Sequence, residues 1–222
     1  MTIAVLGATG MVGSRVITEA RARGHRALAL SRKPASGDPG VTPLAVDARD
    51  PHAVHTALTG SAPHGAADAV VLTVRTTPAD RDFLVGATRT VLDAAARLGI
   101  RVLVVGGAGA LRSPGDGGLL VADDPSYVPA EVRPVALAGV AQLDTCRGHA
   151  HTDWVFLCPP ALLEPGERTG RYRRGTDTLL TAADGRSWIS VEDLAVAVLD
   201  ELEHPRGERV MTVVHEAARP CA

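Results

Sequence analysis

The sequence is poor in aromatic residues and in lysine. Its 222 residues include only two tryptophans, two tyrosines and two phenylalanines, so the core must be built from valine, leucine, alanine and isoleucine. Lys33 is the single lysine among 23 basic residues, and the formal net charge is only −2. A charge so close to zero offers no basic surface to a nucleic acid or an acidic membrane, and neither is expected as a partner.

Cysteine is also scarce. Cys146, Cys158 and Cys221 have no CxxC spacing, which argues against a disulfide framework and for a reducing compartment. The spacing of Cys146, His149 and His151 matches no common zinc pattern and lacks a fourth ligand, so no metal site is expected.

Long hydrophobic runs are missing too. No apolar stretch approaches the ~18 residues that a membrane helix needs. The first strand is predicted to begin at Thr2, which leaves no room for a signal peptide. We therefore expect a cytoplasmic protein that acts on a small molecule as a monomer or homodimer.

Strand and helix patterns alternate along the whole chain. Apolar runs predict seven strands, the fifth and sixth including their exit loops, at residues 2–7, 26–31, 41–47, 67–74, 100–109, 153–163 and 208–214. Helical spacing predicts helices at residues 10–23, 52–59, 80–98, 129–147 and 190–205, with Pro134 delaying the start of the fourth. Residues 170–180 resemble a polar hairpin. This alternation predicts a single-domain α/β protein with a doubly wound, Rossmann-type parallel sheet and helices on both faces.

The stretch VLGATGMVGSRV, residues 5–16, places three glycines between the first strand and the first helix. Gly7 would allow the tight turn, Gly10 the approach of a diphosphate to backbone amides, and Gly13 the close packing of helix on sheet. The helix N-terminus would supply unpaired N–H groups and partial positive charge. A purely structural turn is the alternative interpretation.

The end of the second strand distinguishes the two pyridine dinucleotides. An acidic residue there would bind the ribose 2′-hydroxyl of NAD, but this chain has Ser31, Arg32 and Lys33. A guanidinium suits a 2′-phosphate, so NADP(H) is predicted over NAD(H). Asp47, at the end of the third strand, is placed either to reach the adenine amino group or simply to initiate a turn.

Several longer stretches give the chain a family resemblance. Together with the glycine loop they are LALSR (28–32), VVGGAGAL (104–111), DWVFLCPPALLEPGERTGRYRRG (153–175) and ISVEDLAVAVLDELEHP (189–205). The chain resembles the atypical short-chain dehydrogenase/reductases, and within them the NAD(P)H-binding, NmrA-like group that includes proteins labelled NADH-flavin reductases. The resemblance implies that residues 1–222 form one NAD(P)-binding Rossmann domain, with residues 111–127 and 164–188 as substrate-side loops.

The cofactor would then lie across the carboxyl ends of the strands. The expected contacts are Gly7, Thr9, Gly10, Met11, Val12, Ser31, Arg32, Asp47, Ala48, Thr73, Val74, Arg75, Gly106, Gly107, Cys158, Pro159 and Pro160. Cys158 would contribute backbone near the nicotinamide; a nucleophilic thiolate would need a partner base that the nearby sequence does not offer, and a small buried cysteine is the simpler interpretation.

The typical catalytic residues of short-chain dehydrogenases are absent. Those enzymes use a Tyr-x-x-x-Lys pair, whereas this chain places Val132 and Ala136 at the aligned positions and Ala110 at that of the loop serine. Carbonyl reduction with an enzyme tyrosine is therefore not expected. Tyr127 is the only phenol in this region, and it is either a proton donor or a packing residue.

Arginines supply the remaining candidates for substrate binding. Arg171, Tyr172 and Arg173, continued by Arg174, form the strongest local charge cluster, and Arg112 lies on the loop after GGAG. They could clamp an acidic or phosphorylated acceptor such as FMN, although an exposed hairpin is equally compatible with the pattern.

Three functions follow from an intact glycine loop without the Tyr/Lys pair. The first is an NADPH-dependent reductase of a flavin, quinone or other conjugated acceptor that needs little acid–base help. The second is a regulatory protein that senses the ratio of NADP⁺ to NADPH. The third is a biosynthetic cyclase or isomerase on the same fold.

Overall fold

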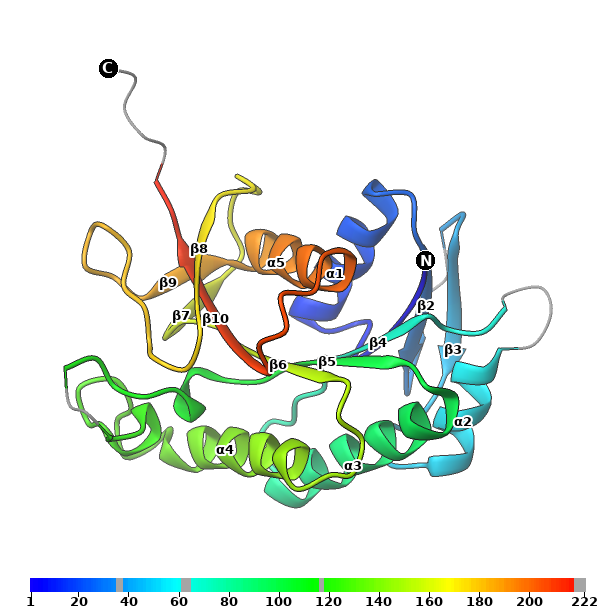
Figure 1. Ribbon diagram of the computed structural model, residues 1–222, viewed down its shortest axis with the longest axis horizontal. Helices are drawn as coiled ribbons and strands as arrows, with labels where there is room; N and C mark the ends of the chain where they lie inside the picture. The colour runs from blue at the N-terminus through cyan, green and yellow to red at the C-terminus, as the bar shows by residue number, and fades with distance from the viewer. Residues whose placement is uncertain (35–37, 61–64, 116–117, 218–222) are drawn as a thin grey trace.

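One predominantly parallel sheet organises the protein. The computed structural model describes residues 1–34, 38–60, 65–115 and 118–217. The sheet has eight strands in the order β3-β2-β1-β4-β5-β6-β10-β8, all parallel to their neighbours except β8, which is antiparallel to β10 (Figure 1). The strands are β1 (Thr2–Leu6), β2 (Arg26–Ser31), β3 (Val41–Ala45), β4 (Ala69–Leu72), β5 (Arg101–Val105), β6 (Trp154–Cys158), β8 (Tyr172–Gly175) and β10 (Val210–His215).

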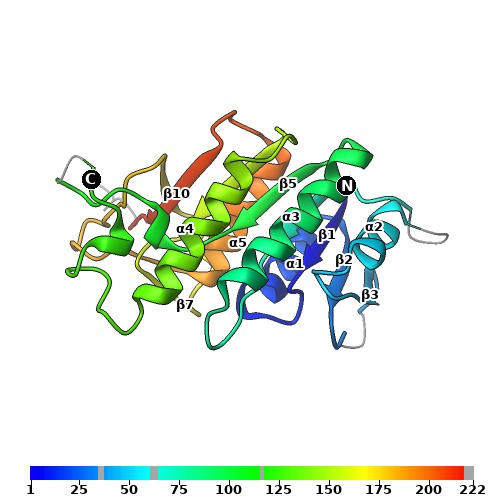
Figure 2. The same ribbon diagram turned by 90° about the horizontal axis from the view of Figure 1, so that it is seen from below.

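Helices cover both faces of this sheet, as the alternating pattern predicts. Helices α1 and α5 lie on one face, and α2, α3 and α4 lie on the other, which Figure 2 shows from below. Their bounds are α1 (Met11–Ala22), α2 (Pro51–Thr59), α3 (Arg81–Leu98), α4 (Arg133–Arg147) and α5 (Val191–Glu203). Two short 3₁₀ helices, η1 (Ala108–Ala110) and η2 (Val121–Asp123), follow β5. The doubly wound α/β architecture is therefore confirmed.

Two apolar layers hold helices and sheet together. Every residue of β1, β4 and β6 is buried, because a strand sandwiched between two helical layers has no solvent face. Phe156 packs on the α2–α4 side, and most of the other large buried side chains are Leu, Ile and Val. The scarcity of aromatic residues is thus compensated by branched aliphatic packing, as the composition predicts.

The main sheet has one strand more than predicted, and a second, two-stranded sheet was not predicted. Residues 170–180 do not form a hairpin of their own; instead β8 adds to β10 as an antiparallel edge strand. The sixth strand ends at Cys158, and Leu162–Glu164 (β7) pairs separately with β9 (Trp188–Ser190) in a small parallel sheet. Pro159 and Pro160 explain the break, because neither offers the N–H that a continuing strand requires. Helix α4 begins at Arg133, so Pro134 delays its start as expected.

Candidate nucleotide and acceptor site

The sheet has its topological switch point between β1 and β4: the chain runs from β1 outward to β2 and β3, then returns to β4 on the other side of β1 and continues outward to β5 and β6. In open parallel sheets ligands bind in the crevice at the carboxyl ends of the strands beside such a point. The segments that follow β1, β2, β3, β4, β5 and β6 all lie at this edge. The predicted cofactor contacts come from these segments, so the topology brings them to one side of the molecule.

The glycine loop after β1 has no room for side chains. Gly7 has φ +89°, and a Cβ there would lie 2.6 Å from Thr73 Oγ1. A Cβ on Gly13 would lie 2.2 Å from the Gly7 carbonyl oxygen, so α1 packs directly against the turn. The Gly7 amide donates to the Leu30 carbonyl oxygen at 3.0 Å, and Thr73 Oγ1 donates to the Leu6 carbonyl oxygen at 2.9 Å. The proposed roles of Gly7 and Gly13 in turn geometry and close packing therefore fit the structure.

Like α4, helix α1 begins without a side-chain cap. Gly10 is its N-cap and offers no side-chain hydrogen bond, and the first turn contains no acidic residue. Asp50, Asp80 and Ser190, by contrast, cap α2, α3 and α5 with side-chain oxygens. The amides at the start of α1 thus have no capping side chain, and the partial positive charge of the helix remains available to an anion.

The end of β2 combines an unsatisfied hydroxyl with a free cation. Ser31 Oγ is buried and has no hydrogen-bond partner, although buried polar atoms are normally satisfied. Arg32, the next residue, is exposed and has no ion pair among the described residues. The glycine cradle, the uncapped helix and this orphaned hydroxyl together suit an adenine dinucleotide.

Asp47 initiates a turn after β3. Its Oδ1 accepts a hydrogen bond from the Arg49 amide at 2.9 Å. That amide and the Arg49 side chain hold the pKa of Asp47 below its ordinary value, and the charge of Arg32 contributes. The turn interpretation is therefore confirmed, while contact with adenine stays a prediction. Ala48 beside it is buried.

Among the remaining cofactor candidates, the structure gives different roles to neighbouring residues. Thr73 stabilises the glycine loop, whereas Arg75 is exposed at the same edge. A Cβ on Gly106 would lie 2.1 Å from Phe156 Cε1, so this glycine is required by the core. A Cβ on Gly107 would meet nothing within 4 Å, so only Gly107 borders open space.

The place where a Tyr/Lys pair would lie is apolar. Helix η1 packs on α4 so closely that a Cβ on Gly109 would lie 2.8 Å from the Ala136 Cβ. Ala110 is buried, while Val132 and Val135 are 46% and 42% exposed. No hydroxyl or amine therefore replaces the missing pair at positions 110, 132 and 136.

Two more large apolar side chains are exposed at the carboxyl edge. Met11, at the start of α1, is 38% exposed, and Leu162, which follows β6, is 44% exposed. Val132, at the start of α4, belongs to the same edge of the sheet. Exposed apolar residues gathered at a ligand-binding edge favour a planar, apolar ligand.

Cys158 ends β6 and is completely buried. Burial raises the pKa of its thiol to about 12, so it is not a thiolate near neutral pH. Pro159 and Pro160 are also buried. The interpretation of Cys158 as a small buried residue is confirmed.

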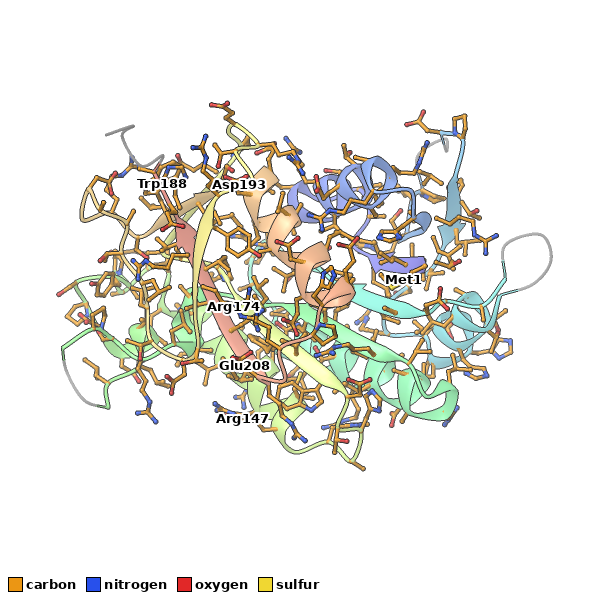
Figure 3. The ribbon with its side chains drawn as sticks, turned by 45° about the horizontal axis from the view of Figure 1, so that its top comes forward. Met1, Arg147, Arg174, Trp188, Asp193 and Glu208 are labelled. Atoms are coloured by element: carbon orange, nitrogen blue, oxygen red, sulfur yellow. The ribbon has the colours of Figure 1, made fainter. Side chains whose placement is uncertain are left out.

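The cluster of residues 171–174 is split across the edge strand β8. The Tyr172 hydroxyl donates to Asp200 Oδ2 of α5 at 2.6 Å, and Arg174 is paired with Glu201 and Glu208. Arg173 instead donates to the Thr181 carbonyl oxygen. Tyr172 and Arg174 are thus engaged on one side of the strand and Arg173 on the other, because alternate side chains of a strand point to opposite faces. Arg171 is exposed, and contact of these residues with a substrate stays a prediction. Figure 3 labels Arg174 and Glu208 at this side of the sheet.

The two predicted substrate-side loops are joined to each other. The Arg112 amide donates to the Asp177 carbonyl oxygen at 2.7 Å, and the Leu179 amide donates to the Arg112 carbonyl oxygen at 2.9 Å. Arg112 Nε also contacts Asp177 Oδ2 at 3.2 Å. Sequence reasoning did not foresee this connection, since 65 residues separate the partners.

Tyr127 follows η2. Its ring packs against the apolar core on the α2–α4 side. No hydrogen bond of its hydroxyl is found among the described residues. Its role as proton donor stays a prediction.

Neither a metal site nor a membrane span is found in the part of the chain that the structure describes. His149 Nε2 contacts Asp93 at 3.2 Å, and Cys146 is buried. No group of three His, Cys, Asp or Glu residues is arranged to hold a metal there. No helix in the same ranges is long and apolar enough to cross a bilayer.

Comparison with known proteins identifies the family to which the chain belongs. Residues 7–205 match the model of a family described as NAD(P)H-binding. Three similar solved structures carry provisional names. An exported protein of Burkholderia pseudomallei is 37% identical, with TM-score 0.83, over 97% of this chain and all of that one. An epimerase of Bacteroides thetaiotaomicron is 32% identical, with TM-score 0.85, over 98% of both chains. An NADH-flavin reductase of Streptococcus pneumoniae is 28% identical, with TM-score 0.81, over 97% of this chain and 99% of that one.

The matched region contains the glycine loop, the uncapped helix and every other segment at the carboxyl edge. This agrees with the resemblance to atypical short-chain dehydrogenase/reductases. On these grounds the chain belongs to the NAD(P)H-binding family, with the Rossmann-type sheet and glycine loop through which such proteins hold their nucleotide.

Proposed function

We propose that the protein is an NADPH-dependent reductase of a flavin, quinone or other conjugated small molecule. The observation that carries this proposal is an intact dinucleotide cradle beside an apolar acceptor region. Gly7, Gly10 and Gly13 supply the cradle, while positions 110, 132 and 136 lack the groups that protonate a carbonyl. Both the family and the NADH-flavin reductase named above are consistent with an NAD(P)H-dependent oxidoreductase.

The preference for NADPH rests on the end of β2. Within the described residues, Arg32 is exposed and has no ion pair, and Ser31 Oγ has no hydrogen-bond partner. A ribose 2′-phosphate would supply acceptors to both groups and would neutralise the guanidinium. An NAD-specific site would instead need an acidic residue at this position.

A bound nicotinamide would supply hydride donation. The protein's part is then to hold the donor and the acceptor in the right geometry and to exclude water between them. Met11, Val132 and Leu162 offer apolar surface to a planar acceptor. Because a flavin or quinone can take its proton from solvent after hydride transfer, no strong acid is required beside it. Tyr127 is the one phenol near this region that could shorten that proton path.

The acceptor is proposed to bind between residues 111–127 and 164–188. Arg112 joins these loops through its backbone and through Asp177. Its terminal guanidinium nitrogens have no partner among the described residues, so they could contact an anionic substituent such as the phosphate of FMN.

The test is turnover with purified protein. NADPH oxidation would be followed with FMN, riboflavin and a soluble quinone under anaerobic conditions, with enzyme-free mixtures as controls. We expect enzyme-dependent loss of NADPH with at least one acceptor. Tight NADPH binding without turnover on any of them would contradict a reductase and favour the redox-sensing alternative.

A non-redox isomerase is the second candidate, since the 32% identical structure is named an epimerase. It predicts no net loss of NADPH.

A cytoplasmic location is proposed from the sparse cysteines, although the 37% identical structure is named an exported protein. A monomer or homodimer is proposed, and light scattering would distinguish them.

A further inference from the structure

Residues 165–170, here called the strap, connect the end of β7 to the beginning of β8. Only Thr169 of these six residues is half-buried, and the others are exposed. Hydrophobic packing therefore cannot hold the strap in place. Its fixed position must come from polar contacts.

Three carboxylates supply those contacts. Asp193 Oδ1 accepts a hydrogen bond from the Gly170 amide at 2.7 Å, and its Oδ2 accepts one from Thr169 Oγ1 at 2.6 Å. Glu192 Oε2 accepts one from the Gly166 amide at 2.8 Å. Glu192 and Asp193 form the first turn of α5, and Figure 3 labels Asp193 there.

The third carboxylate comes from α1, the helix that presents its N-terminus to the diphosphate. Arg168 donates to both oxygens of Glu19, from Nε at 2.7 Å and from a terminal nitrogen at 2.8 Å. Arg15, also of α1, contacts Glu192 at 3.1 Å. The strap is thus tied to α1 and α5 together.

Two of these carboxylates are buried, which is costly for a charged group. Glu19 is 4% exposed and Asp193 is fully buried. A buried ion pair contributes little net stability compared with apolar packing of the same volume, but it enforces one geometry through directed bonds. Glu19 and Asp193 are therefore better suited to fixing the position of the strap than to stabilising the fold.

The position of the strap matters because of what precedes it. The chain reaches the strap from the end of β6, through Cys158, Pro159 and Pro160. These residues lie at the carboxyl edge of the sheet, on the same side of the switch point as β4, β5 and β6. A dinucleotide that crosses this point has its adenosine over β2 and its nicotinamide on the opposite side. Because the strap follows this segment along the chain, holding the strap restrains the segment beside the nicotinamide half.

We propose that Arg168, held by Glu19, and Asp193 are positioning residues that set the nicotinamide side of the nucleotide cleft. The inference rests on the proposed function, since it assumes an NADPH site at this edge. None of these side chains is required to touch the nucleotide. Their effect is confined to the binding of one half of the nucleotide, whereas a role in general stability would affect the binding of both halves.

The experiment compares two ligands by calorimetry. NADPH occupies both halves of the cleft, whereas 2′,5′-ADP occupies only the adenosine half. We expect Arg168→Met to weaken NADPH binding by about tenfold and to leave 2′,5′-ADP binding within about twofold. Arg168→Lys, which keeps the charge but loses the two-pronged contact, should fall between wild type and Arg168→Met.

Arg147→Met is the matched control. Arg147 is 55% exposed and pairs with Asp144 within α4, and it has no contact with the strap among the described residues. It should leave both affinities unchanged. Since the Arg168 side chain is 53% exposed, its variants are expected to fold, and Thr169→Val tests the Asp193 contact independently.

Unchanged NADPH affinity in Arg168→Met and in Thr169→Val would overturn the inference, and so would equal losses for both ligands. If wild-type protein binds neither ligand, the proposed function fails and the inference fails with it. If it binds NADH but not NADPH, only the cofactor choice fails, and the same comparison is made with NADH and AMP.

Discussion

The two halves of the nucleotide cleft are built by different means. The half around β1, α1 and β2 is determined by backbone geometry: Gly7 and Gly13 lie where a Cβ would overlap Thr73 or the Gly7 carbonyl. The half beyond β6 depends on side chains, since carboxylates of α1 and α5 hold the strap and Asp177 holds Arg112. The geometry of the first half suits a diphosphate. In the second half, substitution of a few polar residues would be enough to alter which ligand fits. This suits a family whose members carry different provisional names.

The largest expected effect comes from breaking the backbone half. Gly13→Ala would place a methyl group 2.2 Å from the Gly7 carbonyl oxygen, so α1 must move away from the turn. We expect the free energy of unfolding to fall by about 1–3 kcal/mol and dinucleotide affinity to fall on the order of 100-fold. Urea unfolding and calorimetry measure the two effects.

Gly86→Ala is the control for that substitution. Gly86 lies inside α3, and a Cβ there would meet nothing within 4 Å. Alanine should stabilise the helix by about 0.5–1 kcal/mol without altering nucleotide binding. A comparable loss of affinity in both variants would show that the clash at Gly13 is not the cause.

Arg32→Asp tests the cofactor choice within the same half. The substitution removes the guanidinium and adds a repulsive charge at the end of β2. NADPH should bind roughly 100-fold more weakly, as expected for the loss of one or two charge-assisted hydrogen bonds. NADH affinity should change little. Equal behaviour of the two nucleotides would place the 2′-phosphate elsewhere.

Glu19→Gln tests the side-chain half through its pH dependence. Hydrogen bonds from Arg168 and then Arg23 outweigh burial and hold the pKa of Glu19 below its ordinary 4.5. A lowered pKa in the folded state contributes stability that is present above pH 4.5 and is lost as the pH falls through the lower, folded value. Glu19→Gln should therefore lower the free energy of unfolding by about 1–3 kcal/mol at pH 7 and by less at pH 3. Urea unfolding across this range measures it, and a cost independent of pH would refute the charge-based account.

Tyr127→Phe has the smallest expected effect. The ring packs against the core, and solvent can protonate a conjugated acceptor, so turnover should change by less than about twofold. A general acid would instead contribute about 10²-fold or more. Steady-state NADPH oxidation with the best acceptor decides between them, and a 100-fold loss would make Tyr127 the proton donor.

Local sequence was sufficient for the fold class and for the cradle. Alternating patterns located every helix and the parallel strands of the sheet, and the glycine spacing identified the loop after β1. These features depend on neighbours along the chain, because periodicity and backbone freedom act over a few residues. The late start of α4 was predictable for the same reason.

Only the tertiary structure decided the side-chain half. In the structure, residues 172–175 form an edge strand of the sheet rather than part of a hairpin. The Tyr172 hydroxyl donates to Asp200, and Arg168 pairs with Glu19 across 149 residues of sequence. In the sequence, Glu19 is merely one polar position of an amphipathic helix. The role of a carboxylate depends on the tertiary structure, because folding decides whether it is buried and which residue it pairs with. The need for glycine at a position with positive φ depends on the local backbone alone.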